Sequence, residues 1–386
     1  MLKAKIILPV IVLSQFCGTS LWFAGNSIMN DLVINYGFNS SALGPLTSSV
    51  QLGFIAGTLL FALLAISDRI SPSKVFLVCA VLGSIFNLGI LWEGNNLFSI
   101  LTLRFFTGFF LAGIYPVGMK IAADHFQNGL GKSLGLLVGA LVFGTAFPHL
   151  LKGIFDWESV ILATSGLAFF GGLLLFFLVP DGPFRKPGQK IAFSSFKSLF
   201  GNGEFRAAAF GYFGHMWELY AYWAFIPIIL TFYQSLNPSS NFNIPIISFT
   251  IIAVGGIGCI AGGFLSQHFG AKKIATLSLL ISCICCLVSP FILGLNSEII
   301  LISFLLFWGL TVTADSPLFS TLVAQNAIPE LKGTALTLVN CLGFSISIFS
   351  IQLLNSLKSY TDSYSIYAVL AFGPILGLLA LRKQVN

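Results

Sequence analysis

A chain of 386 residues in which 56% are hydrophobic and only 8% charged is too apolar for a soluble protein, because soluble domains carry about 25% charged residues. It is expected to be an integral membrane protein. The net charge of +6 implies no nucleic-acid partner, since most Lys and Arg residues fall in short loops on one side of the membrane. That distribution predicts a multi-pass plasma (inner) membrane protein with both termini in the cytoplasm.

The chain divides into about twelve apolar stretches, each close to the ~20 residues that a spanning helix needs. In chain order the predicted helices are 6–29, 42–66, 73–92, 97–121, 132–152, 159–179, 206–232, 245–267, 272–294, 298–323, 334–356 and 364–381. The longer stretch 181–205 is rich in Gly, Pro and Lys, including Lys186 and Lys190, and is predicted to be a cytoplasmic linker. The expected fold is all-α, with two pseudo-symmetric six-helix halves, 1–180 and 206–386.

Three charged residues interrupt the apolar stretches: Arg104 in the fourth, Glu218 in the seventh and Asp315 in the tenth. A charge at the bilayer centre costs about 3 kcal/mol or more, so each is a functional candidate by default. Glu218 lies near mid-membrane, one helical turn from His215. Desolvation favours its neutral form, so we expect Glu218 to bind and release a proton, with His215 either sharing that proton or favouring the anion. A structural pair that fixes the helix is the alternative.

The other two charges leave more than one interpretation open. Arg104 keeps its proton, so it needs a permanent partner, which is Glu218, Asp315 or helix carbonyls, or else an anionic substrate. Asp315 precedes Pro317, and a proline removes a backbone donor and can kink a helix. A kink beside a buried acid suits either a gate for protons or a packing bend.

Two turns at corresponding helix ends carry related sequences. Residues 263–273 read GFLSQHFGAKK and residues 64–74 read LAISDRISPSK. They resemble the loop signature of the major facilitator superfamily, although Gln267 replaces its acid and the first copy keeps Asp68 and Arg69 without the glycines. Arg104, followed by Gly108, is similar to the superfamily's arginine motif. In the first turn, Ser71 is expected to cap the next helix, with a proline at its first position.

The resemblance covers essentially the whole chain and implies two halves of inverted repeats around a site near the midplane. The first, fourth, seventh and tenth helices would line a cavity. The candidate solute-binding residues on them are Gln15, Thr19, Trp22, Asn26, Arg104, Tyr115, Tyr222, Trp308 and Thr311, and the proton-coupling candidates are Glu218, His215 and Asp315. The resemblance also implies a cytoplasmic latch, or gate, between the halves at Asp68, Arg69, Gly263 and Gly270. A solvated turn is the alternative for these four residues.

The fifth helix departs from the pattern of drug antiporters in the superfamily, because Ala140 stands where their proline would follow Gly139. The pair Gly135 and Gly139 has the spacing that allows close helix packing, as does the pair at positions 258 and 262. His149, in the same fifth helix, is interpreted as a packing residue.

The predicted function is a secondary active transporter, coupled to protons, for a small polar or anionic organic solute. A drug or metabolite exporter of the same fold is the alternative. The sequence contains no GxxxxGK[ST] or HExxH motif, which disfavours an ATP-driven pump and an intramembrane metalloenzyme. A channel fits poorly, because no filter-like repeat is present. The expected partners are the solute, protons and the lipid bilayer, for a monomer without cofactor or metal. The direction of transport is left open.

Overall fold

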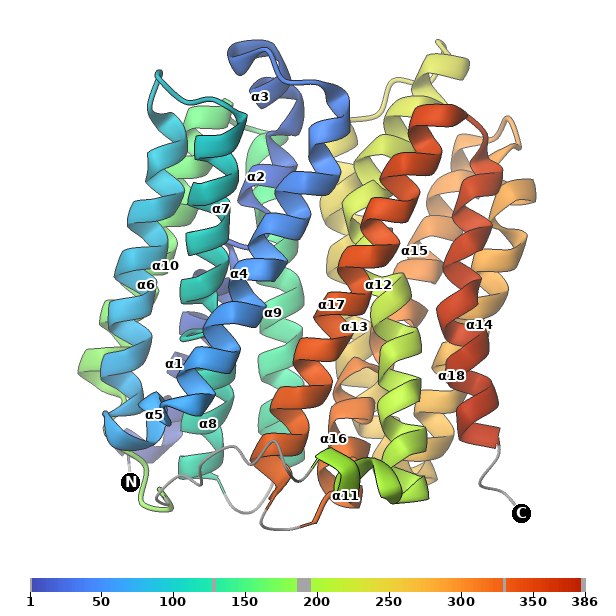
Figure 1. Ribbon diagram of the computed structural model, residues 1–386. Coiled ribbons are helices and arrows are strands. Elements are labelled where there is room, and N and C mark those ends of the chain that lie inside the picture. Colours follow the sequence, from blue (N-terminus) through green and yellow to red (C-terminus); the bar gives the residue numbers. More distant parts are fainter. Residues whose placement is uncertain (1, 127–129, 186–195, 329–330, 383–386) are drawn as a thin grey trace. The chain divides into compact units, whose positions relative to one another are not determined.

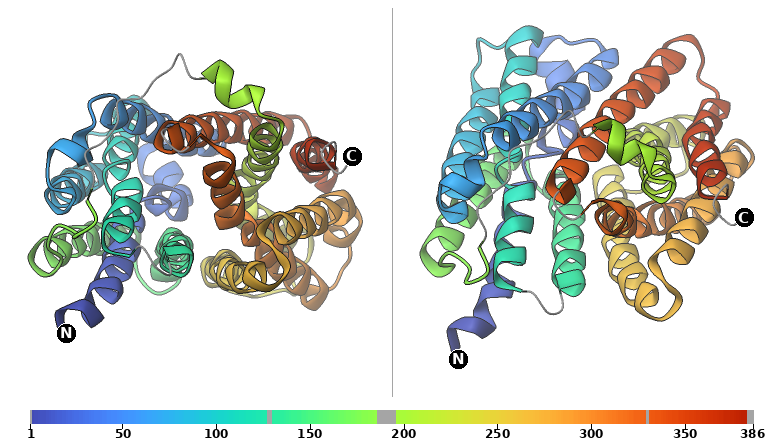
Figure 2. Two further views of the ribbon diagram at one scale, coloured as in Figure 1. Left: turned by 90° about the horizontal axis from the view of Figure 1, so that it is seen from below. Right: turned by 60° about the horizontal axis from the view of Figure 1, so that its bottom comes forward.

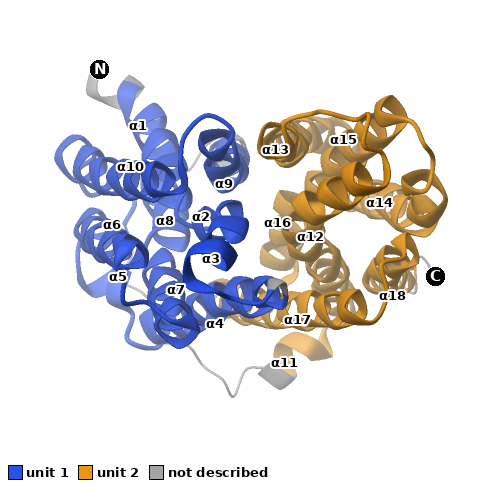
Figure 3. Ribbon diagram, turned by 90° about the horizontal axis from the view of Figure 1, so that it is seen from above, with its two compact units in different colours: residues 1–190 blue, residues 191–386 orange. Residues whose placement is uncertain are grey.

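The computed structural model describes residues 2–126, 130–185, 196–328 and 331–382 (Figure 1). The chain forms two compact units, residues 1–190 and 191–386, here called the N-terminal unit and the C-terminal unit (Figure 3). The predicted linker residues Lys186 and Lys190 lie outside the described residues.

Every regular element in the described ranges is helical. The N-terminal unit contains α1 (Leu2–Thr19), α2 (Ala24–Ser27), α3 (Met29–Tyr36), α4 (Leu43–Leu63), α5 (Ile66–Arg69), α6 (Pro72–Leu88), α7 (Leu97–Leu111), α8 (Tyr115–His125), α9 (Leu130–Lys152) and α10 (Trp157–Leu178). The C-terminal unit contains α11 (Phe196–Gly201), α12 (Gly203–Leu236), α13 (Ile244–Phe269), α14 (Ala271–Leu293), α15 (Glu298–Ala314), α16 (Ser316–Asn326), α17 (Lys332–Tyr360) and α18 (Phe372–Arg382), the last preceded by the 3-10 helix η5 (Tyr364–Ala371).

Eleven helices among the described residues are long and apolar enough to cross a membrane. The predicted all-α membrane fold is therefore confirmed. The predicted first helix, 6–29, differs because its apolar helix ends at Thr19 and the chain resumes as α2 and α3. Near the break, the hydroxyls of Thr19 and Ser20 donate to the carbonyls of Gln15 and Cys17 at 2.8 and 2.7 Å. Hydroxyls that bond back to carbonyls in this way compete with the helical backbone pattern.

Two further predicted spans are interrupted where a proline begins a new helix. The predicted helix 97–121 divides into α7 and α8, and 298–323 divides into α15 and α16 on either side of Asp315. The helix is thus interrupted at Asp315, shortly before Pro317, where the sequence predicts a kink. By contrast, α12 runs unbroken for 34 residues (Figure 1).

Each unit repeats the same pairing of helices. In the N-terminal unit α4 packs on α7, and in the C-terminal unit α13 packs on α15 (Figure 2). A side chain at Gly258 or Gly262 would overlap a backbone carbonyl of the facing helix, which confirms close packing at this pair. The parallel expectation for Gly135 is wrong, since a Cβ at that position meets open space.

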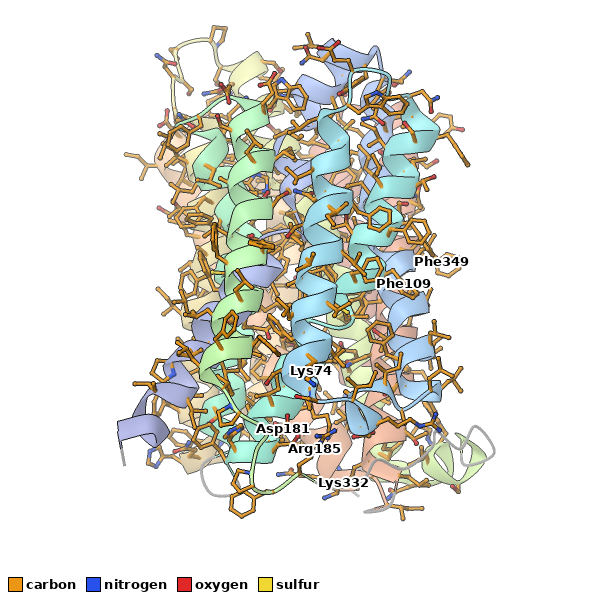
Figure 4. All side chains as sticks on the ribbon, turned by 90° about the vertical axis from the view of Figure 1, so that its left-hand side faces the viewer. Lys74, Phe109, Asp181, Arg185, Lys332 and Phe349 are labelled. Atoms are coloured by element: carbon orange, nitrogen blue, oxygen red, sulfur yellow. The ribbon has the colours of Figure 1, made fainter. Side chains whose placement is uncertain are left out.

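The end of the N-terminal unit that contains α5 is held by Asp181 and Arg185, which follow α10 (Figure 4). Pro72 lies in the first turn of α6, as predicted, but Ser71 does not cap the helix with its side chain. Its hydroxyl donates instead to Asp181 Oδ1 at 2.6 Å. The expected cap is therefore wrong, because the Ser71 oxygen accepts no hydrogen bond from the first turn of α6.

Candidate functional site: buried charges in each unit

Glu218 lies in the middle of α12 and is fully buried. Trp308 Nε1, from α15, donates to its Oε1 at 2.6 Å, and Ser282 Oγ, from α14, donates to its Oε2 at 3.0 Å. The thiol of Cys286 contacts the same carboxyl. The three neighbours come from two helices and none is a permanent cation. The carboxyl is therefore solvated by neutral groups in a site that excludes bulk water.

Aromatic packing fixes the indole that contacts Glu218. Tyr222, one turn along α12, packs against Trp308 with ring centroids 4.6 Å apart and the ring planes tilted by 39°. Its hydroxyl donates to the Leu305 carbonyl at 2.5 Å. Thr311 Oγ1 lies 3.1 Å from the Trp308 carbonyl. The predicted residues Tyr222, Trp308 and Thr311 thus lie together beside Glu218.

His215 lies one turn before Glu218 on α12 but contacts a different acid. Its Nδ1 is 2.8 Å from Oδ1 of Asp315, at the junction of α15 and α16, and both side chains are fully buried. The rings of Tyr212 and Phe319 flank the imidazole at 6.0 and 6.3 Å between centroids. The sequence suggested that His215 shares the proton of Glu218. The structure instead pairs it with Asp315.

The C-terminal unit thus holds two separate buried acids. Among its described residues, no Lys or Arg forms an ion pair with Glu218 or Asp315. Over the described ranges no group of three or more His, Cys, Asp or Glu side chains is placed to hold a metal ion. Acids buried in membrane helices in this way are candidates for a functional role.

Arg104, on α7 in the N-terminal unit, is also fully buried, but its contacts are of another kind. Its Nη2 donates to the carbonyls of Leu21 and Trp22 at 3.1 and 2.5 Å, in the break between α1 and α2. Its Nη1 donates to Asn87 Oδ1 at 3.1 Å. Gly25 lies against the guanidinium, and a Cβ at this position would be only 3.0 Å from Arg104 Nε. Of the alternatives in the sequence, this geometry corresponds to neutralisation by helix carbonyls.

The polar stripe predicted on the first helix is divided by the same break. Thr19 donates within α1, whereas Asn26 Nδ2, on α2, donates to Thr47 Oγ1 on α4 at 2.6 Å. Trp22 packs edge-on against Phe54 of α4, with ring centroids 4.9 Å apart. The predicted residue Tyr115 is half-buried at the start of α8. The stripe therefore makes contacts with α4 that its spacing alone does not show.

Two buried amides in the N-terminal unit have no hydrogen-bond partner among the described residues. They belong to Gln15 on α1 and Gln51 on α4, and both side chains are fully buried. His149 Nε2, on α9, likewise has no partner in the described part of the chain. A buried amide without a partner is costly, so these groups are candidates for contact with a polar solute.

The predicted latch residues Asp68 and Arg69 lie in the short helix α5. Gly263 lies near the end of α13, and Gly270 lies between α13 and α14. Asp68 forms an ion pair with Lys120 at 2.9 Å, and Lys120 is also 3.5 Å from Asp124. Arg69 is exposed. In the C-terminal unit, Gly263 is half-buried and Gly270 precedes α14 with φ +85°, a conformation that favours glycine. A contact of these residues between the units stays a prediction.

The fold and these contacts agree with one family. The family model of the Major Facilitator Superfamily matches residues 11–351. The chain belongs to this superfamily. It is a multi-pass membrane transporter, and the superfamily's members bind small molecules within the membrane. No curated protein matches it by sequence.

Solved structures of other transporters share the superfamily fold at low identity. The human organic anion transporter MFSD10 (TETRAN) is 15% identical with a TM-score of 0.78, over 98% of this chain and 99% of that one. The proton:xylose symporter XylE is 14% identical with a TM-score of 0.74, over 99% and 96%. The nucleoside transporter NupG is 15% identical with a TM-score of 0.72, over 99% and 100%. At this identity the similarity shows the fold alone.

Three contact residues were missed from the sequence. Ser282 and Gln51 each stand among other small polar residues in an apolar helix, and Asn87 lies near the end of a predicted span. The available signal was that an amide inside a membrane helix faces the protein interior. The same principle predicts that the amides of the first helix, Gln15 and Asn26, face the protein interior.

Proposed function

We propose that the protein is a secondary active transporter that moves a small polar or anionic organic solute by alternating access of its two units, coupled to protons. The observation that carries the proposal is the chemistry of the C-terminal unit. Glu218 and Asp315 are fully buried, and their contacts are an indole, a hydroxyl, a thiol and an imidazole. An intramembrane acid without a permanent cation can change its charge by binding a proton, as a proton-coupled carrier requires.

We assign distinct roles to the buried charges. Glu218 is the proton-binding group, because its contacts remain compatible with both charge states. Asp315 and His215 form a second pair at a broken helix, where a change of charge would act on the angle between α15 and α16, as a gate does. Arg104 is a structural cation, since its donors already serve the carbonyls of Leu21 and Trp22.

The solute is proposed to meet the unpartnered amides of the N-terminal unit. Gln15 and Gln51 each offer both donors and an acceptor, which suits hydroxyl, amide or carbonyl groups of a polar organic molecule. Transporters of a sugar, a nucleoside and an organic anion share this fold, so these classes form the panel of solutes to test.

The topology of the proposal follows from the distribution of Lys and Arg. Both termini and the segment 181–205 are placed in the cytoplasm of a plasma-membrane monomer, with Asp68, Arg69, Gly263 and Gly270 as the cytoplasmic latch. Single cysteines introduced at Lys152 and Lys358 should react with an impermeant reagent added outside intact cells. Reaction only from the inside would reverse the orientation.

The function is tested with purified protein in liposomes. Uptake of a pentose, a nucleoside and an organic anion is measured with and without a pH gradient. We expect one class to accumulate only with the gradient, and Glu218→Gln to lose that accumulation while still equilibrating the solute. Glu298→Gln, a half-buried acid at the end of α15, is the matched control. Accumulation by Glu218→Gln equal to that of the wild type would contradict the assignment.

A further inference from the structure

Ser282 faces two acceptors with a single proton. Its Oγ lies 3.0 Å from Glu218 Oε2 and 3.1 Å from the carbonyl oxygen of Leu279, in the preceding turn of α14. A serine hydroxyl donates one hydrogen bond and accepts up to two. It can therefore donate to only one of these oxygens at a time, and the charge of Glu218 decides which.

The two charge states of Glu218 use the hydroxyl in opposite directions. When Glu218 is ionised, Ser282 donates to Oε2, because a buried carboxylate needs donors and binds them strongly. When Oε2 carries a proton, it donates to Ser282 Oγ, and the serine hydroxyl turns to the Leu279 carbonyl. Serines in helices commonly make such a bond to their own helix. Only in the protonated state are both short contacts hydrogen bonds at once.

The same geometry selects the oxygen that carries the proton. Oε1 accepts from Trp308 Nε1 at 2.6 Å, and an indole N–H can only donate. A proton on Oε1 would therefore point at a group that cannot accept it. Oε1 behaves as a carbonyl oxygen in the neutral acid, and Trp308 holds it in both charge states. Oε2, which faces the hydroxyl of Ser282, is left as the protonated oxygen.

We propose that Ser282 is the positioning residue of the proton site. It directs the proton to Oε2 of Glu218 and reverses its own hydrogen bond when that proton binds or leaves, so that the change of charge reaches the backbone of α14. The inference rests on the proposed function of Glu218 as the proton-binding group. The step consumes only a proton: a lone pair of Oε2 forms the O–H bond, the carboxylate loses its charge, and release is the reverse.

Other titratable groups surround the carboxyl. They are Tyr222 on α12, Cys283, Cys285 and Cys286 on α14, and Asp315 with its partner His215. Of these, Cys286 contacts Glu218 directly. Ser289→Ala is the matched control, because it removes a buried hydroxyl of the same helix whose hydrogen bond goes to the Cys286 carbonyl, at 2.8 Å.

The test follows Glu218 by infrared difference spectroscopy while the purified full chain in detergent is titrated with acid. The carboxyl band is assigned by its loss in Glu218→Gln. We expect Ser282→Ala to shift the band and move its titration midpoint up by about one pH unit, about tenfold in proton affinity, because the ionised form loses the stronger hydrogen bond. Ser282→Thr, which keeps a hydroxyl, and Ser289→Ala should retain wild-type values.

Each outcome of this titration separates the two proposals. A wild-type band and midpoint in Ser282→Ala would overturn the role of Ser282 and leave Glu218 as the proton-binding group. If the wild type has no band that Glu218→Gln removes, Glu218 binds no proton and both proposals fail. Should Ser282→Ala not fold, Ser282→Cys offers a weaker donor at the same position, and its midpoint should move in the same direction.

Discussion

The two units of this transporter bury charge in opposite ways. In the N-terminal unit, Arg104 is a permanent cation whose fork of donors binds the carbonyls of Leu21 and Trp22, where the first helix breaks. In the C-terminal unit, Glu218 and Asp315 are acids whose contacts are neutral or protonatable groups. The corresponding helix there, α12, is continuous.

The difference teaches how a buried charge indicates its role. A guanidinium does not lose its proton. It can therefore donate hydrogen bonds to the carbonyls of a broken helix at every stage of a transport cycle. A carboxyl among neutral donors keeps its contacts when its charge changes. One unit therefore has a charge suited to holding structure, and the other has charges suited to a cycle of protonation.

The strongest way to break this comparison is to remove the structural cation. Arg104→Ala leaves two carbonyls and the Asn87 amide oxygen unpaired, and we expect it to lower the free energy of unfolding by about 3–5 kcal/mol. Arg104→Lys keeps the charge without the fork and should lose less. Thermal unfolding in detergent is the measurement, with the exposed Arg69→Ala as control. A stable Arg104→Ala protein that has lost solute affinity would make Arg104 a binding residue instead.

The next largest effect is expected at the pair of His215 and Asp315. Either His215→Ala or Asp315→Ala leaves its partner buried without its contact, whereas the double variant removes both. The two changes should therefore be non-additive, with a coupling of about 0.5–3 kcal/mol, measured by unfolding of both single variants and the double variant. Simple additivity would show that the 2.8 Å contact contributes nothing.

A smaller effect is expected at Gln51. This residue tests solute binding in the N-terminal unit separately from proton coupling in the C-terminal unit. Gln51→Leu replaces an unpartnered buried amide by an apolar group, so stability should be unchanged or slightly higher. The KM for the transported solute should rise about tenfold, the loss of ~1.4 kcal/mol of binding, while accumulation still requires the pH gradient. An unchanged KM would remove Gln51 from the proposed solute site.

The smallest effect is expected at Asp68, in the short helix α5. Asp68→Asn breaks the 2.9 Å ion pair between Asp68 and Lys120. The side chains of both residues are about a fifth exposed. Such a pair contributes about 1 kcal/mol or less, and salt screens it. If Asp68 acts in the latch, the uptake rate should fall in a variant whose melting temperature barely changes. Uptake and melting that fall together would indicate a structural role alone.

The fold could be predicted from the sequence because apolar length determines the number of spans. The breaks in the helices were harder to predict. The sequence predicts one continuous helix at the first break, because Thr and Ser are common inside apolar stretches. The donor to the carbonyls that the break leaves free is Arg104, which lies far along the chain. The break at Asp315 was anticipated because a proline marks it directly.

The site was predicted by residue type and not by partner. Glu218, Arg104 and Asp315 are recognisable as charges in apolar helices, but the donors to Glu218 come from α14 and α15. Helical spacing relates His215 to Glu218, and only the packing of α12 against the α15–α16 junction assigns it to Asp315. Contacts between helices are set by tertiary packing, which periodicity along one helix does not contain.

The central claim is that Glu218 couples solute transport to protons. The most direct test measures whether movement of the solute drives movement of protons. Liposomes that contain the protein and a trapped pH-sensitive dye receive the transported solute on one side, without an initial pH gradient. The account predicts that the wild type and Arg104→Lys move protons with the solute, and that Glu218→Gln moves the solute without protons. Solute-driven proton movement that survives in Glu218→Gln would contradict it.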